Sequence, residues 1–214
     1  SQSPFHARYS QTAPRDDSGV ADIGTIAHRI LLEGHENGIA LIDADDWRTE
    51  AAKELRDAAY AEGRIPMLLG KMDAVRAMVD SAREYLARSE IAGIFDTGAP
   101  EQTLIWSEGE TLCKARPDWL TADRRICLSY KTTAGSAKPD AWIRTQLPQY
   151  DLGIALYGRG TERRVVTLVQ EQSAPYSCSL IGLDPAWQAL AESRLNLALS
   201  TWKDCLEAGK FPAY

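Results

Sequence analysis

Two neighbouring apolar segments, joined by a short polar link, constrain the fold of this chain more than any other feature. Residues 112–120 and 125–132 have the composition of β-strands. The first carries Asp118 near its end, and the second carries Ser129 and Lys131. Because alternate residues of a strand lie on the same face, Ser129 and Lys131 share one face of their strand. We therefore expect Asp118, Ser129 and Lys131 to meet at one site.

Helical and strand-like patterns fill the rest of the chain. Apolar residues at helical spacing, with capping residues at several ends, predict helices over 3–9, 23–33, 45–62, 71–88, 140–157 and 185–208. Pro148 is expected to kink or divide the fifth of these helices. Further strands are predicted over 103–106, 164–170 and 176–181, with a hairpin turn at 108–110. The order of helices, a three-stranded meander, a helix, two strands and a helix predicts an α/β or α+β fold with a mixed sheet.

Length and cysteine pattern set the wider expectations. At 214 residues the chain is expected to form one domain, with a mainly helical part over 1–95 and a sheet-containing part over 96–214. It has no apolar run of 18 residues and no basic-then-apolar start, so neither a membrane span nor a signal peptide is expected. The four cysteines form no CxxC pair, which argues against a zinc cluster and predicts reduced, mostly buried thiols in the cytosol.

The charge is unevenly distributed along the sequence. A net charge of −6 argues against a generic nucleic-acid binder. Residues 114–164, however, contain ten Lys or Arg and only five Asp or Glu. Such a basic window in an acidic protein is typical of a localised phosphate-binding channel, although a window of this length also reaches this composition by chance.

The expected meeting of Asp118, Ser129 and Lys131 indicates phosphodiester chemistry. Hydrolysis of a phosphodiester near neutral pH is aided by a divalent cation that orients water and offsets charge on the phosphate. Mg²⁺ takes oxygen ligands, usually one or two carboxylates with water and substrate phosphate. A lysine two residues along the second strand can orient water or stabilise developing charge. Alone, an Asp followed by a strand with one Lys is a weak signal.

Several further motifs carry a resemblance to a known family. Residues 113–120 followed by 129–133 resemble the PD-(D/E)xK nuclease pattern, in which an Asp ends one strand and an acid-x-Lys follows on the next. The segment 24–34, with His28, resembles the conserved helix of the RecE-type exonucleases, the group of exonuclease VIII and its phage relatives. Similarity to that family extends in chain order to the segments 3–9, 149–157, 171–176 and 202–214.

The resemblance implies a fold, an activity and partners. It implies an α/β fold with a restriction-endonuclease-like core, in which helices flank a central mixed sheet. Family members are metal-dependent deoxyribonucleases that degrade linear double-stranded DNA from the 5′ end, which implies Mg²⁺, or Mn²⁺ in its place, as the cofactor. The resemblance also implies a homo-oligomer that has a single-strand annealing protein as its partner. It implies a cytoplasmic protein, bacterial or phage-encoded, with no membrane association.

The resemblance also assigns roles to individual residues. Asp118 is implied as the metal ligand, with His28 and Glu101 as supporting ligands, and Lys131 as the catalytic lysine. Arg116 and Arg144 are candidates for contacts with DNA phosphates, because a guanidinium binds phosphate in a bidentate manner.

Each of these residues also has an ordinary structural explanation. Asp118 is compatible with a turn cap, Lys131 with a solvated strand lysine and His28 with a hydrogen-bonded core histidine. Glu101 is compatible with an exposed strand-edge acid, and the two arginines with ordinary salt bridges.

Three positions depart from the family pattern. Ser129 stands where the family has Asp, and Gly153 stands where a late helix presents a Gln; Pro148 lies just before it. Ser129 is then an engineered replacement, a tolerated variant or a natural loss. In place of the missing Gln, Gln149 or Gln146 is an alternative residue to support the active site. A neutral serine is a poorer ligand than a carboxylate, so we expect metal affinity and rate to fall by about two orders of magnitude. The alternative function is a catalytically inactive, nuclease-derived DNA-binding or assembly module.

Overall fold

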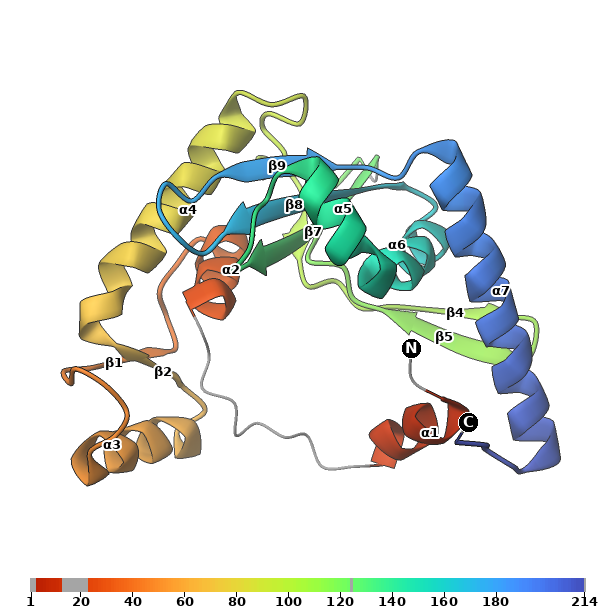
Figure 1. Ribbon diagram of the computed structural model, residues 1–214, viewed down its shortest axis with the longest axis horizontal. Coiled ribbons are helices and arrows are strands. Elements are labelled where there is room, and N and C mark those ends of the chain that lie inside the picture. The colour runs from red at the N-terminus through yellow and green to blue at the C-terminus, as the bar shows by residue number, and fades with distance from the viewer. Residues whose placement is uncertain (1–2, 13–22, 124, 214) are drawn as a thin grey trace.

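A five-stranded mixed sheet lies at the centre of the structure, a computed structural model that describes residues 3–12, 23–123 and 125–213 (Figure 1). The helices are α1 (Pro4–Thr12), α2 (Ile23–Glu33), α3 (Glu50–Ala61), α4 (Met72–Ala87), α5 (Pro139–Thr145), α6 (Leu147–Thr161) and α7 (Pro185–Ala208), with the 3-10 turn η1 (Leu69–Lys71) before α4. The strands are β1 (Ile39–Ile42), β2 (Ile65–Leu68), β3 (Ala99–Pro100), β4 (Leu104–Glu108), β5 (Thr111–Ala115), β6 (Trp119–Leu120), β7 (Ile126–Thr133), β8 (Arg164–Glu171) and β9 (Cys178–Ile181).

The central sheet has the strand order β3-β6-β7-β8-β9. Its two longest strands, β7 and β8, are parallel and connected through α5 and α6, whereas the other pairs are antiparallel. Ser129 is opposite Thr167 and Lys131 is opposite Val169 in the β7–β8 register. The predicted α/β fold with a central mixed sheet flanked by helices is therefore confirmed.

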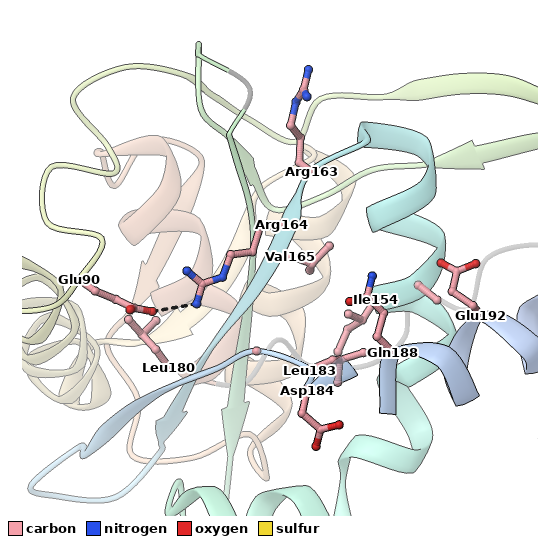
Figure 2. A pocket seen from close by; sticks show the side chains of 12 residues that line it. Glu90, Ile154, Arg163, Arg164, Val165, Leu180, Leu183, Asp184, Gln188 and Glu192 are labelled. Atoms are coloured by element: carbon pink, nitrogen blue, oxygen red, sulfur yellow. Dashed lines mark hydrogen bonds and ion pairs between the residues drawn. The ribbon is translucent and has the colours of Figure 1, made fainter. Parts of the chain in front are cut away.

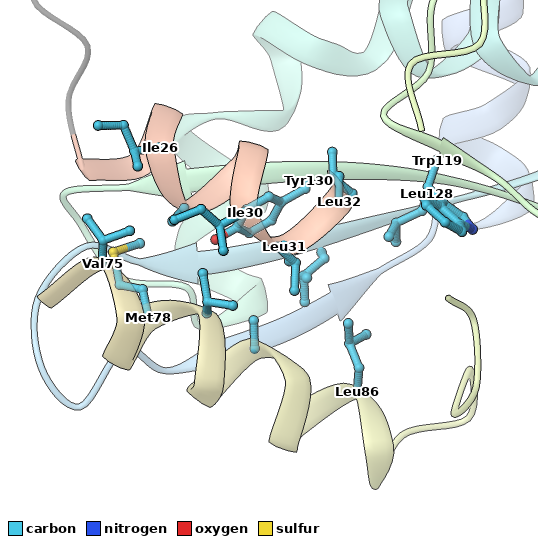
Figure 3. Packing of buried hydrophobic residues seen from close by; sticks show 14 of the residues in the cluster. Ile26, Ile30, Leu31, Leu32, Val75, Met78, Leu86, Trp119, Leu128 and Tyr130 are labelled. Carbon is cyan, nitrogen blue, oxygen red and sulfur yellow. The ribbon is translucent and has the colours of Figure 1, made fainter. Parts of the chain in front are cut away.

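Helices cover both faces of this sheet. On one face, α2 and α4 bury a continuous apolar cluster that includes Ile26, Val75 and Met78 against Leu128 of β7 (Figure 3). On the other face, α5 and α6 pack Trp142, Leu147 and Ile154 against Val169 of β8. Because strand side chains alternate, Tyr130 belongs to the α2 face, whereas Ser129 and Lys131 lie on the α6 face. The candidate site thus draws on helices from both sides of the sheet.

The predicted strand 112–120, and with it the three-stranded meander, is wrong. The segment divides into β5, which pairs with β4 in a separate hairpin, and the short β6, which pairs with β7 in the central sheet. Pro117 has no N–H for a ladder, and the Asp118 side chain rather than its backbone bonds to β7. The predicted turn between β4 and β5 is confirmed, with Gly109 at a φ of 60°.

Three short strands were not predicted. β1 and β2 form a small parallel sheet against which α3 packs, and β3 pairs with β6. The predicted helix over 45–62 begins only at Glu50, because the hydroxyl of Thr49 accepts the backbone N–H of Ala52 and caps the helix there. By contrast, the division of the helix near Pro148 is confirmed, since α6 begins at Leu147 and places Pro148 in its first turn.

Helix α1 lies beside α7 and the segment that follows it (Figure 1). The Phe5 N–H donates to the carbonyl of Pro212 at 3.2 Å, and the Arg8 guanidinium lies over the Phe211 ring. The four cysteines are free, and all but Cys178 are buried. No helix in the described ranges has the length and apolar character needed to span a membrane.

Candidate functional site

The side chain of Asp118 collects donors from α2 and β7. Its Oδ2 accepts the backbone N–H of Tyr130 at 2.6 Å, the Ser129 hydroxyl at 3.2 Å and the Lys131 ammonium at 3.2 Å. Its Oδ1 lies 3.3 Å from Nε2 of His28. The structure therefore brings together four residues that the sequence placed at one site, and they lie on three different elements or loops.

The electrostatic surroundings keep Asp118 ionised. Burial raises the pKa of this carboxyl, but the hydrogen bond with His28, the charge of Lys131 and the Tyr130 N–H together outweigh burial and hold the pKa below its ordinary value. A buried carboxylate held in this way offers negative charge at neutral pH, which a cation ligand requires.

His28 reaches Asp118 because α2 lies very close to β7. A Cβ atom on Gly24, one turn before His28, would lie 2.2 Å from Oγ1 of Thr132 and 2.7 Å from Nε2 of Gln172. The absence of a side chain at this glycine therefore permits the close approach. The His28 ring stacks on Tyr130, with 5.6 Å between ring centroids and 15° between planes.

Tyr130, which stacks on the histidine, and Gln170, which binds Tyr130, were given no role in the sequence prediction. The Tyr130 hydroxyl donates to Oε1 of Gln170, whose Nε2 donates to the carbonyls of Met78 at 2.8 Å and Tyr176 at 3.2 Å. Gln170 is completely buried. A glutamine in the otherwise apolar run of β8 was the available signal, because a buried amide must find partners.

Glu101 completes a possible cation site. It follows β3 with a φ of 54°, its N–H donates to the Asp118 carbonyl at 3.1 Å, and its Oε2 lies 2.8 Å from Nε of Arg116. One ligand atom from each of His28, Glu101 and Asp118 lies within 4.8 Å of the others. Two carboxylates and an imidazole suit Mg²⁺ in part and Mn²⁺ well, so these residues fit a divalent cation.

A cavity of about 100 Å³ opens beside this group. It lies between β7, β8 and α6, and its lining includes Ser129, Lys131, Thr167, Gln149 and Gly153. A Cβ atom on Gly153 would meet nothing within 4 Å, so the position can accept a larger side chain. Gln149 is thus near the candidate site, whereas Gln146 lies at the α5–α6 junction and is not among the lining residues.

A second hollow adjoins the first. It measures about 360 Å³ and is lined by residues of α2 and β7, including Gly24, His28 and Thr132. Lys131 and Tyr150 line both hollows, and the Lys131 ammonium lies 5.9 Å from the centroid of the Tyr150 ring. Tyr150 in turn stacks on Trp142. A substrate at Lys131 would therefore find open space on both sides of the lysine.

The two candidate DNA-binding arginines differ in position. Arg116 joins the site through Glu101 while its side chain remains 60% exposed. Arg144 lies on α5, where its Nε donates to the carbonyl of Asp140, and the described contacts do not connect it with the other site residues. Elsewhere in the basic window, Arg164 pairs with Glu90 and Arg159 with Glu192. Acidic residues outside the window therefore offset part of its positive charge.

Another pocket is separate from these residues (Figure 2). It measures about 400 Å³ and lies where β8 begins and α7 starts, with Arg164 and Glu90 bridged across it and Asp184 at its rim. None of the residues predicted to form the site lines it. The chemistry-bearing side chains thus gather in the smaller hollows around Lys131.

One solved structure has a fold similar to that of this chain. No protein-family model matches the chain, and no curated protein sequence matches it. The fold is similar to the crystal structure of a "putative exonuclease" from Eubacterium rectale, with a TM-score of 0.53 and 10% sequence identity. The similarity covers 94% of this chain and 75% of that chain. At this identity the match bears on the fold alone.

Proposed function

We propose that this chain is a divalent-cation-dependent deoxyribonuclease that degrades linear double-stranded DNA from the 5′ end, in the manner of RecE-type exonucleases. The observation that carries the proposal is the convergence of His28, Glu101 and Asp118 beside Lys131 on a fold similar to that of the bacterial structure. A homo-oligomer and a single-strand annealing protein as partner belong to the same proposal and rest on the sequence resemblance.

Each residue of the site would have its own role in the proposed reaction. His28, Glu101 and Asp118 would hold Mg²⁺ or Mn²⁺, and the chemistry that such a cation would supply is polarisation of the phosphate and activation of water. Lys131 carries its positive charge 3.2 Å from Asp118, where it can orient water or stabilise charge on the phosphate. Arg116, exposed at the rim, is placed to contact a neighbouring phosphate.

Ser129 is the residue of this arrangement that is least suited to binding a cation. Its hydroxyl is buried and donates to Asp118, so it fills a bond to the carboxylate without adding negative charge. Lys131 also pairs directly with Asp118. Both contacts favour, as a second candidate, a DNA-binding module descended from a nuclease and lacking catalysis. Salt-sensitive DNA binding with no cleavage in Mg²⁺ or Mn²⁺ is the result that would select it.

The proposal is tested by comparing linear with covalently closed circular duplex DNA. Purified protein is incubated with each substrate in Mg²⁺ and in Mn²⁺, with chelator and Asp118→Asn as controls. Loss of the linear substrate alone, dependent on the cation and on Asp118, supports an exonuclease. Equal cleavage of the circle contradicts exonuclease action, and activity that survives Asp118→Asn contradicts the assigned site.

A further inference from the structure

We propose that the cavity between β7, β8 and α6 is a binding site for a small monocarboxylate of the size of acetate, and that this anion binds together with the divalent cation. This inference rests on the proposed cation site and adds a ligand to it. The cavity's volume of about 100 Å³ decides what can enter. A water molecule needs about 10–15 Å³ of such volume, so there is room for a ligand of several heavy atoms.

The polar groups around the cavity suit one carboxylate. The Lys131 ammonium supplies a positive charge at its edge, while the Ser129 hydroxyl on the same strand face donates to Asp118 and leaves the anion to other donors. The Thr167 hydroxyl lies opposite Ser129 in the strand register, on a residue that is only 2% exposed. Among the described residues this hydroxyl has no hydrogen-bond partner. A carboxylate here would accept from a hydroxyl that lines the cavity and makes no hydrogen bond to the described residues.

The remaining walls suit a short apolar tail. Ile154 and the rings of Tyr150 and Tyr157 line the side formed by α6. Gly153 leaves this side open, because it has no side chain and a Cβ atom there would meet nothing within 4 Å. Acetate matches both the polar and the apolar part of the cavity, with its oxygens toward Lys131 and Thr167 and its methyl toward α6.

The charges around Asp118 link this anion to the cation. Ser129 Oγ lies 3.2 Å from Asp118 Oδ2, so an anion near Ser129 is repelled by that carboxylate. A divalent cation on His28, Glu101 and Asp118 reverses the repulsion. Each ligand should then strengthen the binding of the other by the same factor, because coupling between two sites is reciprocal.

The test is calorimetric titration of Mn²⁺ into the full chain in potassium acetate and in potassium chloride of equal ionic strength. We expect acetate to tighten Mn²⁺ binding about tenfold, the lower end of the effect of a supporting group at a metal site. Gly153→Leu fills the cavity and should remove the difference between the salts, whereas Gly153→Ala should retain it. Ser129→Asp supplies a covalent carboxylate and should bind Mn²⁺ tightly in both salts.

The outcomes separate this inference from the proposed function. If Mn²⁺ binds the wild-type chain equally well in acetate and chloride, the anion site is wrong and the cation site stands. An acetate effect of the same size in wild type, Gly153→Leu and Ser129→Asp also overturns the anion site, because the anion then acts elsewhere. If neither wild type nor Ser129→Asp binds Mn²⁺ in either salt, the cation site itself is wrong and the inference is overturned with it.

Discussion

Asp118 is the residue on which the candidate site depends, because one carboxylate satisfies donors from α2 and β7 at once. The Tyr130 N–H, the Ser129 hydroxyl and the Lys131 ammonium share its Oδ2, and His28 faces its Oδ1. Its ionised form is therefore part of the folded structure as well as a candidate ligand. Protonation of this carboxyl should weaken both roles together.

The pH dependence of stability tests this view of Asp118. Its folded-state pKa lies below the unfolded value, so the ionised group stabilises the fold above the unfolded value of about 3.9. That stability is lost as the pH falls through the folded pKa. We expect Asp118→Asn to lower the free energy of unfolding at pH 7, with a gap to wild type that narrows below about pH 4. Urea unfolding at several pH values measures the gap.

The matched control is Asp57→Asn, on the exposed surface of α3, which should give a profile parallel to that of wild type. A constant gap between wild type and Asp118→Asn from pH 7 to pH 3 would contradict the role assigned to the Asp118 charge.

At the scale of elements, the approach of α2 to β7 determines whether His28 reaches the site. Gly24 allows this approach, since a Cβ there would overlap Thr132 and Gln172. Gly153 on α6 is the converse case, because a Cβ there meets open space. The two helical glycines therefore serve as a matched pair for alanine substitution.

We expect Gly24→Ala to destabilise the protein by about 1–3 kcal/mol, the usual range for overpacking, and to weaken Mn²⁺ binding by displacing His28. Gly153→Ala should instead stabilise it by about 0.5–1 kcal/mol, because alanine favours the helix. Urea denaturation measures both changes. Equal effects of the two substitutions would show that α2 does not rely on Gly24 for its contact with β7.

The pair of Tyr130 and Gln170 gives a second test at this scale. Gln170→Leu leaves the Tyr130 hydroxyl and two backbone carbonyls without their partner, at a cost of about 1–3 kcal/mol for each buried group left unsatisfied. Combining it with Tyr130→Phe removes one of these groups. We therefore expect the double variant to be more stable than the sum of the single effects predicts, by about 0.5–3 kcal/mol.

The exposed Gln188→Leu on α7 is the control for Gln170 and should change stability little. Strict additivity of the Tyr130 and Gln170 effects in a double-mutant cycle would contradict a direct coupling between the two side chains.

The sequence predicted most long elements but few of the short ones. α2 and α7 have strong apolar periodicity or clear caps, and they begin and end where predicted. β1 and β2 are too short for alternation to show, and β3 has only two residues. The break between β5 and β6 depends on Pro117 and on a side-chain bond across the sheet, which no local pattern reveals.

Local sequence patterns likewise revealed only some of the residues of the candidate site. His28, Asp118 and Lys131 could be placed together from motif spacing and resemblance, and the structure does bring them together. Gln170 could not be given a role, because its partners Met78 and Tyr130 are distant in sequence. The cavity beside Ser129 could not be predicted from the sequence either, because it depends on how α6 crosses two strands.

For the whole molecule, the folded structure redistributes the charge seen along the sequence. Arg116, Arg159 and Arg164 of the basic window pair with acids from outside it. Among the described residues, Lys114, Arg125, Arg144 and Arg163 of the window form no ion pair with an acid. The DNA binding proposed for this acidic chain of net charge −6 would then rely on a small number of phosphate contacts.

Salt dependence measures the number of those contacts. The logarithm of the binding constant for duplex DNA, measured in Ca²⁺ to limit cleavage, should fall linearly with the logarithm of salt concentration. Arg116→Ala and Arg144→Ala should each reduce the magnitude of the slope by about one. Lys53→Ala on α3 is the control and should leave the slope unchanged. Binding that does not depend on salt would contradict a phosphate-contacting surface.

The most direct test of the account is digestion of end-labelled linear duplex DNA by wild type, Ser129→Asp and Ser129→Asn in Mg²⁺ and Mn²⁺. The aspartate supplies a charged ligand next to Asp118, whereas the asparagine supplies an uncharged side chain of the same size. We expect Ser129→Asp to digest the DNA about a hundredfold faster than wild type, and Ser129→Asn not to do so. Absence of cleavage by all three chains, with folding and DNA binding intact, would contradict the assignment of a nuclease site.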